Sequence, residues 1–149
     1  MTGVGRAALI TAGAAAATFA VDRVLKVAVE HTLDEGEQVQ GPLGIRIRRQ
    51  PNQHGIAGSE QGSGTNTALL LAGGALALGI AGAGTMLRRP TMLQVGAGMV
   101  AGAMAANLVD RAMQGSVTDY LPSPLGVLNA ADVALGAGIV LGGLGMALR

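Results

Sequence analysis

The sequence predicts a mainly α membrane protein with four transmembrane helices and a small extracytoplasmic β-cradle after the first helix. Half of the 149 residues are hydrophobic, 13% are charged, and the mean hydropathy of +0.46 is high for a water-soluble domain. Four apolar stretches are long enough to cross a bilayer, since about 20 helical residues span about 30 Å of hydrocarbon. The 25 glycines suit this setting, because small residues let transmembrane helices pack closely.

The four apolar stretches define the expected helices in chain order. They cover about residues 7–29, 67–87, 92–110 and 132–148. The first could instead be a cleaved signal peptide with Arg6 as its charged region, but apolar character resumes after Lys26 and favours an anchored helix. The second is the clearest, because it carries no charged residue. No tandem repeat divides the chain, so we expect one integral-membrane domain over residues 1–149.

The charges that flank the helices predict the orientation of the chain. Four basic residues would share one side of the membrane without an acid among them: Arg6, Arg88, Arg89 and Arg149. The acids of the first loop fall on the opposite side: Glu30, Asp34, Glu35, Glu37 and Glu60. Because basic residues concentrate in cytoplasmic loops, we expect both termini in the cytoplasm and the first loop outside.

The outer loop, at about residues 36–60, contains a short alternating pattern. Leu43, Ile45 and Ile47 alternate with glycine and arginine, which predicts a strand with one apolar and one basic face. Such a strand could contact lipid head groups, or it could simply cap the helices as an edge strand; the pattern alone favours the cap. Residues 58–66 have the composition of a flexible linker.

Composition narrows the chemistry that this chain can perform. Without cysteine it has no disulfide and no thiol nucleophile. With His31 and His54 as the only histidines, we expect no metal site and no cofactor. The net charge of +1 and the lack of a basic tract with interleaved aromatics predict no nucleic-acid partner.

Two aspartates at the facing ends of the last two apolar stretches form a candidate catalytic pair. Asp110 ends the third helix and Asp132 begins the fourth, so antiparallel helices would bring both carboxyl groups to a similar depth at the outer surface. Two neighbouring, partly desolvated carboxyl groups can share one proton near neutral pH. Aspartic proteases use such a pair to activate water and to hydrogen-bond the scissile carbonyl. The alternative is that both are ordinary polar residues at a membrane surface.

Residues around the pair admit both structural and functional interpretations. Asn107 shares a helical face with the first aspartate, while Asn129 precedes the second by three residues, a spacing that also suits a helix N-cap. Arg111 could bind lipid phosphate or anchor the helix end at the interface. Asp22 and Lys26, spaced i,i+4 in the first helix, would neutralise each other.

Four short motifs, taken in order, resemble those of lipoprotein signal peptidases, the type II signal peptidases of bacteria. They are D-R-V-L-K at 22–26, A-N-L-V-D-R at 106–111, V-T-D-Y at 117–120 and L-N-A-A-D at 128–132. The resemblance covers nearly the whole chain. It implies four transmembrane helices, a strand-rich outer cradle, and an aspartyl dyad that we assign to Asp110 and Asp132.

The activity that the resemblance implies is removal of the signal peptide from diacylglyceryl-modified prolipoproteins, by cleavage before the lipidated cysteine. Residues expected to support the dyad or to contact substrate are Asn107, Arg111, Asn129, Asn52 and Gly55. Residues expected to be structural are Asp22, Lys26 and Asp119. The chain would act as a monomer in the bacterial cytoplasmic (inner) membrane, with prolipoproteins and membrane lipids as its partners and its active site at the outer face.

Departures from the family pattern motivate a second hypothesis. Ala106 stands where the family has glycine, Leu128 where it has phenylalanine, and Asn52 is one residue out of register with Gly55. A divergent membrane protein that binds lipidated peptides without cleaving them, or that takes another substrate, is therefore the alternative. A proton-coupled carrier is disfavoured, because the second helix has no charged residue to continue a path across the membrane.

Overall fold

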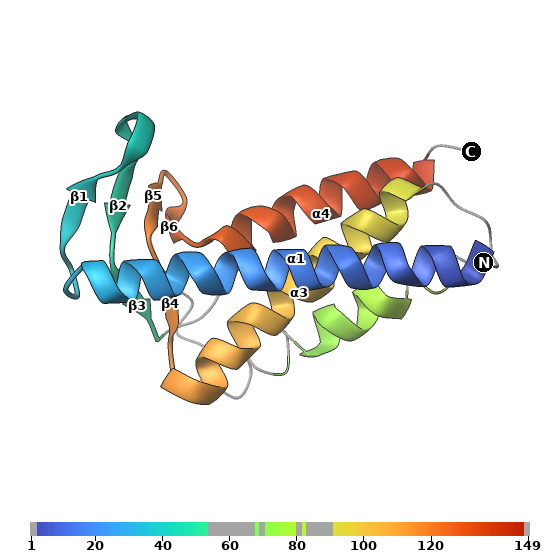
Figure 1. The fold of residues 1–149 in the computed structure, drawn as a ribbon, viewed down its shortest axis with the longest axis horizontal. Helices are drawn as coiled ribbons and strands as arrows, with labels where there is room; N and C mark the ends of the chain where they lie inside the picture. Colours follow the sequence, from blue (N-terminus) through green and yellow to red (C-terminus); the bar gives the residue numbers. More distant parts are fainter. Residues whose placement is uncertain (1–2, 54–67, 69–70, 80–81, 83–90, 148–149) are drawn as a thin grey trace.

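Three long helices dominate the structure, a computed structural model that describes residues 3–53, 68, 71–79, 82 and 91–147. They are α1 (Gly3–Thr32), α3 (Thr91–Gln114) and α4 (Ala130–Ala147) (Figure 1). Each is long and apolar enough to cross a membrane. Of the expected helix at 67–87, the described residues are helical, and the remainder lies outside the described residues.

The helices extend beyond the apolar stretches from which they were predicted. α1 runs through Thr32 and α3 through Gln114, each about one turn past the expected end. The helical backbone hydrogen bonding continues through the polar residues at these ends, so hydropathy alone underestimates helix length. The predicted mainly helical membrane class is confirmed, with three candidate spans among the described residues.

Small residues set how closely the helices approach one another. α1 lies parallel to α3, since Thr11 and Ala15 of α1 contact Gly98 and Gly102 of α3 in the same order. α4 returns antiparallel to α3 and packs its glycines against that helix, with Gly145 beside Leu93. Ala103 and Ala106 of α3 and Ala131 of α4 form a buried core between the helices, with Phe19 and Leu135 beside them. Close backbone approach is how helices associate in lipid.

Replacing Gly102 with alanine is expected to destabilise the packing of α1 against α3 by about 1–3 kcal/mol. An added Cβ would lie 2.9 Å from Cα of Ala15, and backbone cannot move aside as a flexible side chain could. Gly136 in α4 has nothing within 4 Å of such a Cβ, so Gly136→Ala is the matched control. Thermal unfolding followed by circular dichroism in detergent should separate the two variants; equal melting temperatures would contradict this packing.

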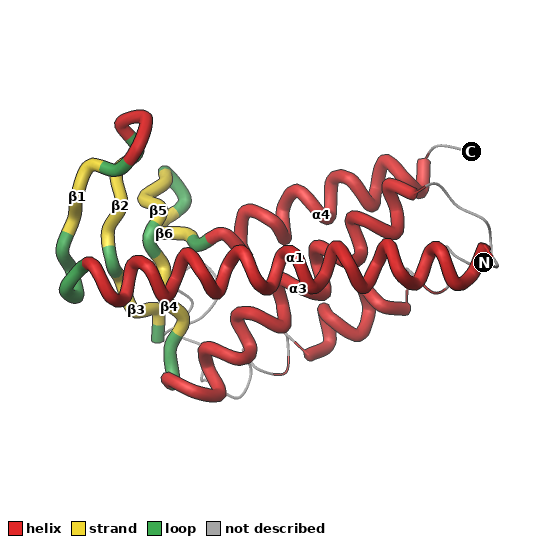
Figure 2. The backbone as a smooth tube through the Cα atoms, viewed as in Figure 1, coloured by secondary structure: helices red, strands yellow, loops and turns green. Residues whose placement is uncertain are grey.

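Six short strands lie at one end of the helices (Figure 2). Three follow α1: β1 (Gln38–Gln40), β2 (Arg46–Arg48) and β3 (Gln50–Asn52). Three connect α3 to α4: β4 (Val117–Asp119), β5 (Leu121–Ser123) and β6 (Gly126–Leu128). They form the antiparallel pairs β1–β2, β3–β4 and β5–β6. The β3–β4 pair joins the loop after α1 to the connection between α3 and α4. The sequence had predicted strands only in the loop after the first helix.

The expected strand through Leu43 is wrong at its beginning. Pro42–Gly44 is a 3-10 turn between β1 and β2, with Leu43 at φ 58° and almost fully exposed. The alternating pattern therefore falls partly on a chain reversal. Ile47, in β2, instead packs on the buried cluster of Val29, Leu33 and Tyr120, as a strand that caps the helices would. The expected cradle from residue 54 onward lies outside the described residues.

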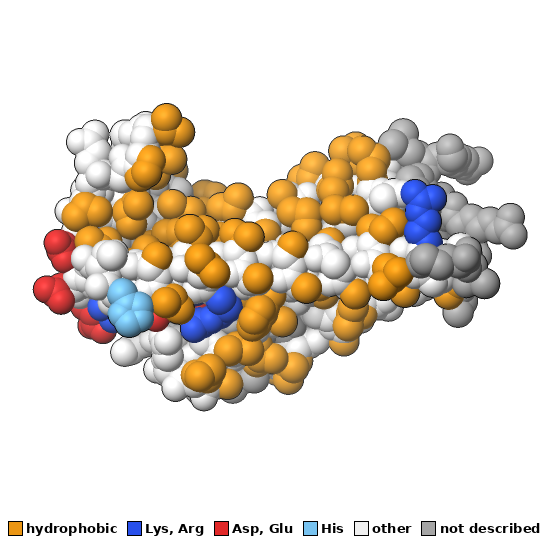
Figure 3. Space-filling view, in the orientation of Figure 1, with side chains coloured by type: hydrophobic (Ala, Val, Ile, Leu, Met, Phe, Trp, Pro, Cys, Tyr) orange, Lys and Arg blue, Asp and Glu red, His pale blue; other side chains and the backbone are white. Residues whose placement is uncertain are grey.

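The molecular surface is apolar along the helices and acidic at the end where the strands lie. Hydrophobic side chains cover much of the visible helix surface, and acidic side chains gather at the end where the strands lie (Figure 3). Large apolar residues such as Val24, Leu76 and Val140 are more than half exposed along the helices. Exposure of this kind suits helices surrounded by lipid.

Candidate active site

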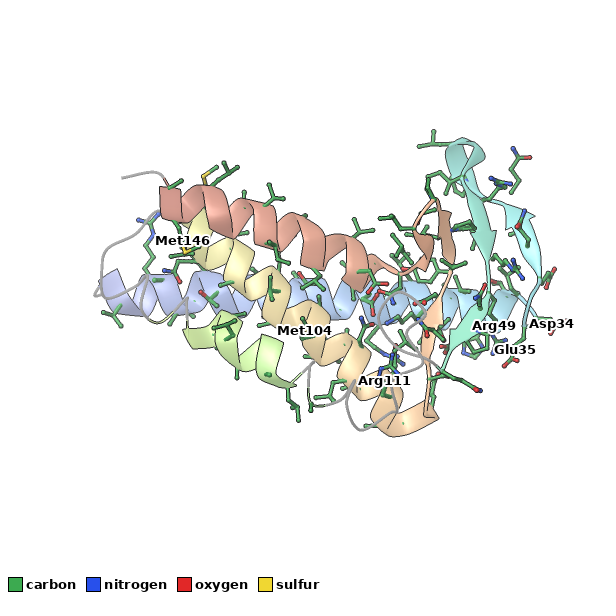
Figure 4. All side chains as sticks on the ribbon, turned by 180° about the vertical axis from the view of Figure 1, so that it is seen from behind. Asp34, Glu35, Arg49, Met104, Arg111 and Met146 are labelled. Carbon is green, nitrogen blue, oxygen red and sulfur yellow. The ribbon has the colours of Figure 1, made fainter. Side chains whose placement is uncertain are left out.

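A set of buried polar side chains lies where α1, α3 and α4 meet β4. They are Asp22, Lys26, Asn107, Asp110, Asp119 and Asn129, each at most 9% exposed. Figure 4 shows nitrogen and oxygen atoms crowded between the helices and the strands. Buried charges are costly unless they are paired, so the contacts of these residues determine what the cluster can do.

Lys26 connects α1 to α3 through its side chain. Its Nζ lies 2.6 Å from Oδ2 of Asp22 and 2.6 Å from Oδ2 of Asp110. It also donates a hydrogen bond of 2.9 Å to Oδ1 of Asn107, so three acceptors match its three N–H groups. Asp22 in turn accepts a hydrogen bond of 2.8 Å from the backbone N–H of Ala131 in α4. The pair expected from the i,i+4 spacing is thus part of a larger network.

Arg23 supplies a second cation to the same network. Its Nη1 forms an ion pair with Oδ1 of Asp110, whose other oxygen contacts Lys26. Both oxygens of Asp110 therefore contact a cation, and its side chain has no exposed surface. These contacts fix the orientation of the Asp110 carboxylate between α1 and α3.

Asp132 is held by uncharged donors at the start of α4. Asn129 is the N-cap: its Oδ1 accepts the N–H of Asp132 at 2.9 Å, and Oδ2 of Asp132 accepts the N–H of Asn129 at 3.1 Å. This reciprocal pair is a capping box. The other carboxyl oxygen, Oδ1, accepts a hydrogen bond of 3.3 Å from Nδ2 of Asn107. Capping fixes the orientation of the carboxyl group and leaves its charge unpaired by these contacts.

Asp119 lies at the end of β4 and is also held by amides. Its two oxygens accept hydrogen bonds from Nδ2 of Asn129 at 2.7 Å and from Nδ2 of Asn52 at 2.9 Å. Burial raises the pKa of Asp119 to about 6, and the nearby charge of Asp132 adds to the rise, against the lowering effect of the two amides. A carboxyl group with such a pKa can hold or release a proton near neutral pH.

Tyr120 fixes the connection between β4 and α4. Its hydroxyl oxygen accepts a hydrogen bond of 3.1 Å from the N–H of Ala130, the first residue of α4. Burial raises the pKa of Tyr120 to about 12, so it stays neutral. The aromatic ring packs on Val29 and Leu33 of the α1 end. Tyr120 thereby holds the strand that carries Asp119 against the helix that carries Asp132.

Of the remaining candidates, the structure describes Asn52 and Arg111 but not Gly55. Asn52 of β3 contacts Asp119 of β4, whereas Gly55 lies outside the described residues. Arg111 is half-buried, and its Nε and Nη1 atoms are buried without a hydrogen-bond partner among the described residues (Figure 4). No group of three or more histidine, aspartate or glutamate side chains in the described ranges is arranged to hold a metal ion.

The structure adds one residue that the sequence motifs did not single out, Arg23. It stands beside Asp22 within an apolar helix, and an ionisable residue in such a segment is itself a signal of function. The motif instead identified Lys26, because its i,i+4 spacing from Asp22 predicts an ion pair within one helix. Contact between Arg23 and α3 depends on the packing of two helices that are far apart in sequence.

Comparison with known proteins places the chain in a family. The family model described as signal peptidase (SPase) II matches residues 14–148. A bacterial membrane enzyme structure at 2.3 Å resolution is similar in fold, with a TM-score of 0.73 and 20% identity over 92% of this chain and 84% of that one. A second, at 1.9 Å, has a TM-score of 0.75 and 19% identity over 95% and 92%. Among curated proteins, no sequence matches the chain.

Proposed function

The chain belongs to the signal peptidase II family, and we propose that it cleaves diacylglyceryl-modified prolipoproteins with Asp110 and Asp132 as its catalytic carboxyl pair. Cleavage would occur before the lipidated cysteine and release the signal peptide. The sequence motifs pair these two aspartates, and Asp119 is expected to have a structural role beside them.

One residue, Asn107, carries the assignment. Its Oδ1 accepts a hydrogen bond from Lys26, which contacts Asp110, and its Nδ2 donates to Asp132, so one amide links the surroundings of both carboxyl groups. Asn129 supports the pair, because its backbone N–H donates to Asp132 and its side-chain amide donates to Asp119.

Asp110 is held in place by two cations of α1. Arg23 and Lys26 each contact one of its oxygens, which fixes the carboxylate at the outer end of α3. Asp119 is held by amides instead, since Asn52 and Asn129 donate to its two oxygens.

The mechanism needs no group beyond the two carboxyls and a water molecule. The ionised member of the pair takes a proton from water as the oxygen attacks the scissile carbonyl carbon. The protonated member donates a hydrogen bond, and then its proton, to the carbonyl oxygen. When the tetrahedral intermediate collapses, the C–N bond breaks and the amine of the cysteine residue takes up a proton from the pair. Asn129 and Asn107 keep the carboxyl groups oriented throughout.

We place the site at the outer surface of the bacterial cytoplasmic membrane. The start of α1 and the end of α4 lie at the end of the bundle opposite the strands (Figure 1), and basic residues flank that end in the sequence. The positive-inside rule then assigns both termini to the cytoplasm. Prolipoproteins would reach the carboxyl pair with their lipid against the apolar helices, and the protein would act as a monomer.

The decisive experiment is cleavage by purified protein in detergent. A lipobox peptide with a diacylglyceryl-modified cysteine should be cut before that cysteine, whereas the same peptide with an unmodified cysteine should be cut far more slowly. Mass spectrometry of the products identifies the bond that breaks. Binding of the lipidated peptide without any product would instead support the non-catalytic alternative, and equal cleavage of both peptides would reject the substrate class.

A further inference from the structure

Tyr120 contacts the start of α4, and the proposed function gives it no role. It lies directly after β4, is 3% exposed, and its hydroxyl oxygen accepts a hydrogen bond of 3.1 Å from the N–H of Ala130. We propose that Tyr120 is a positioning residue whose hydroxyl fixes the first turn of α4 and thereby the carboxyl group of Asp132. This inference rests on the proposed function, because Asp132 is a member of the proposed catalytic pair.

The first turn of α4 is held by acceptors that lie outside the helix. The first N–H groups of any helix have no partner within it. In α4, three of them donate to side chains from three parts of the chain: Tyr120 after β4, Asp22 in α1 and Asn129 just before the helix. The last of these three N–H groups belongs to Asp132 itself. The acceptors therefore determine where the turn that carries Asp132 lies.

Tyr120 is a rigid acceptor because the whole residue is fixed on several sides. Its ring packs on Val29 and Leu33 at the end of α1. Its backbone N–H donates to the carbonyl oxygen of Leu128 at 2.8 Å, and its own carbonyl oxygen accepts the N–H of Arg48 at 3.0 Å. The hydroxyl therefore ties the first residue of α4 to the strands.

The hydroxyl also lies close to the carboxyl group that it would position. Burial raises the pKa of Tyr120 to about 12, and the charges of Asp22 and Asp132 add to the rise. The hydroxyl is therefore neutral and close enough to Asp132 to respond to its charge. A general base must lie within hydrogen-bond reach of the attacking water, and a displacement of about 1 Å can cost about 10²-fold in rate. A small shift of the first turn of α4 is thus enough to slow the reaction.

The test replaces Tyr120 with phenylalanine, which removes the hydroxyl and keeps the packing of the ring. We expect kcat for the lipidated peptide to fall about tenfold while KM stays within about twofold, because Asp132 is displaced and the surface that binds the peptide is unchanged. Asp22 and Asn129 still hold the next two N–H groups, so α4 should remain formed. Both constants are measured at a temperature at which circular dichroism shows the variant to be folded.

Ser123→Ala is the matched control, because the Ser123 hydroxyl also accepts a backbone N–H at 3.1 Å, that of Leu125. This bond lies in the exposed turn between β5 and β6, within the same connection between α3 and α4. Ser123→Ala should keep kcat within about twofold of wild type. An equal loss in the two variants would overturn the inference, since the effect would then not depend on α4.

A rescue variant separates positioning from fold stability. Proline has no backbone N–H and is favoured at the first position of a helix, so Ala130→Pro removes the donor that the Tyr120 hydroxyl accepts. In the Ala130→Pro background, Tyr120→Phe should change kcat by less than about twofold. A loss that persists in that background would show that the hydroxyl does not act through α4, and it would overturn the inference.

Hydrogen exchange followed by NMR tests the same contact without any cleavage. The N–H groups of Ala130 and Asp132 should exchange about tenfold faster in Tyr120→Phe than in wild type, and Ser123→Ala should leave both rates unchanged. Unchanged rates in Tyr120→Phe would overturn the inference, even if Ala130→Pro did not fold.

The outcomes distinguish this inference from the proposed function. If wild type cleaves the lipidated peptide and Tyr120→Phe has the wild-type kcat, the role of Tyr120 is wrong and the function stands. If wild type does not cleave, the function fails, and the exchange rates alone decide whether Tyr120 fixes the first turn of α4.

Discussion

Replacing Asp132 with asparagine is expected to lower cleavage of the lipidated peptide by about 10³-fold or more while the protein remains folded. An amide can neither take a proton from water nor donate one as an acid. Its oxygen can still accept the N–H of Asn129, so the cap of α4 should survive. Because the chain has no tryptophan, folding is best followed by circular dichroism.

The matched control for this variant is Asp34→Asn. Asp34 is an exposed aspartate in the turn after α1, remote from the buried cluster (Figure 4), so the same chemical change there should leave kcat/KM within about twofold of wild type. If Asp132→Asn cleaves at the wild-type rate, Asp132 does not act on water, and the carboxyl mechanism is wrong.

Replacing Lys26 with methionine should cause the largest loss of stability of any single change in the cluster. Methionine is similar in length to lysine but uncharged. Among the described contacts, the substitution leaves Asp22 without a cation and Asp110 with Arg23 alone. Removing one partner of a buried ion pair costs about 3–5 kcal/mol. For a chain of this size that corresponds to a fall in melting temperature of roughly 10 °C.

Arg6→Met provides the comparison for Lys26→Met, because it removes an exposed cation from the same helix. Adding Asp22→Asn to Lys26→Met should recover part of the lost stability, since it removes the carboxylate that has no other cation. A Lys26→Met protein that melts at the wild-type temperature would show that the cluster does not hold the helices together.

The helices were predictable because their signal is local. Length and apolar composition identify α1, α3 and α4 from about 20 residues each, without knowledge of their neighbours. The strands were harder to predict: each is three residues long, and β3 is stabilised by pairing with β4, more than 60 residues away. Leu43 shows the same limit, since its apolar side chain fits a strand pattern but its backbone forms a turn.

The candidate site was predictable as a set of residues but not as a set of partners. Spacing on one helix correctly placed Asn107 and Asp110 on one face, and Asn129 in a cap with Asp132. It could not indicate that two cations of α1 surround Asp110. Asp119, interpreted as structural, lies in a short strand whose position depends on pairing and on Tyr120. Contacts between side chains of different helices depend on how the helices pack, and residue spacing within one helix does not show this.

The assignment of the catalytic pair is tested most directly by comparing Asp119→Asn with Asp110→Asn in the peptide cleavage assay. Both variants make the same chemical change to a buried aspartate. We expect Asp110→Asn to lose about 10³-fold in kcat while it remains folded, and Asp119→Asn to keep measurable cleavage at the same bond despite a lower melting temperature. Full activity in Asp110→Asn, together with complete loss in a folded Asp119→Asn, would contradict the account and place Asp119 in the dyad.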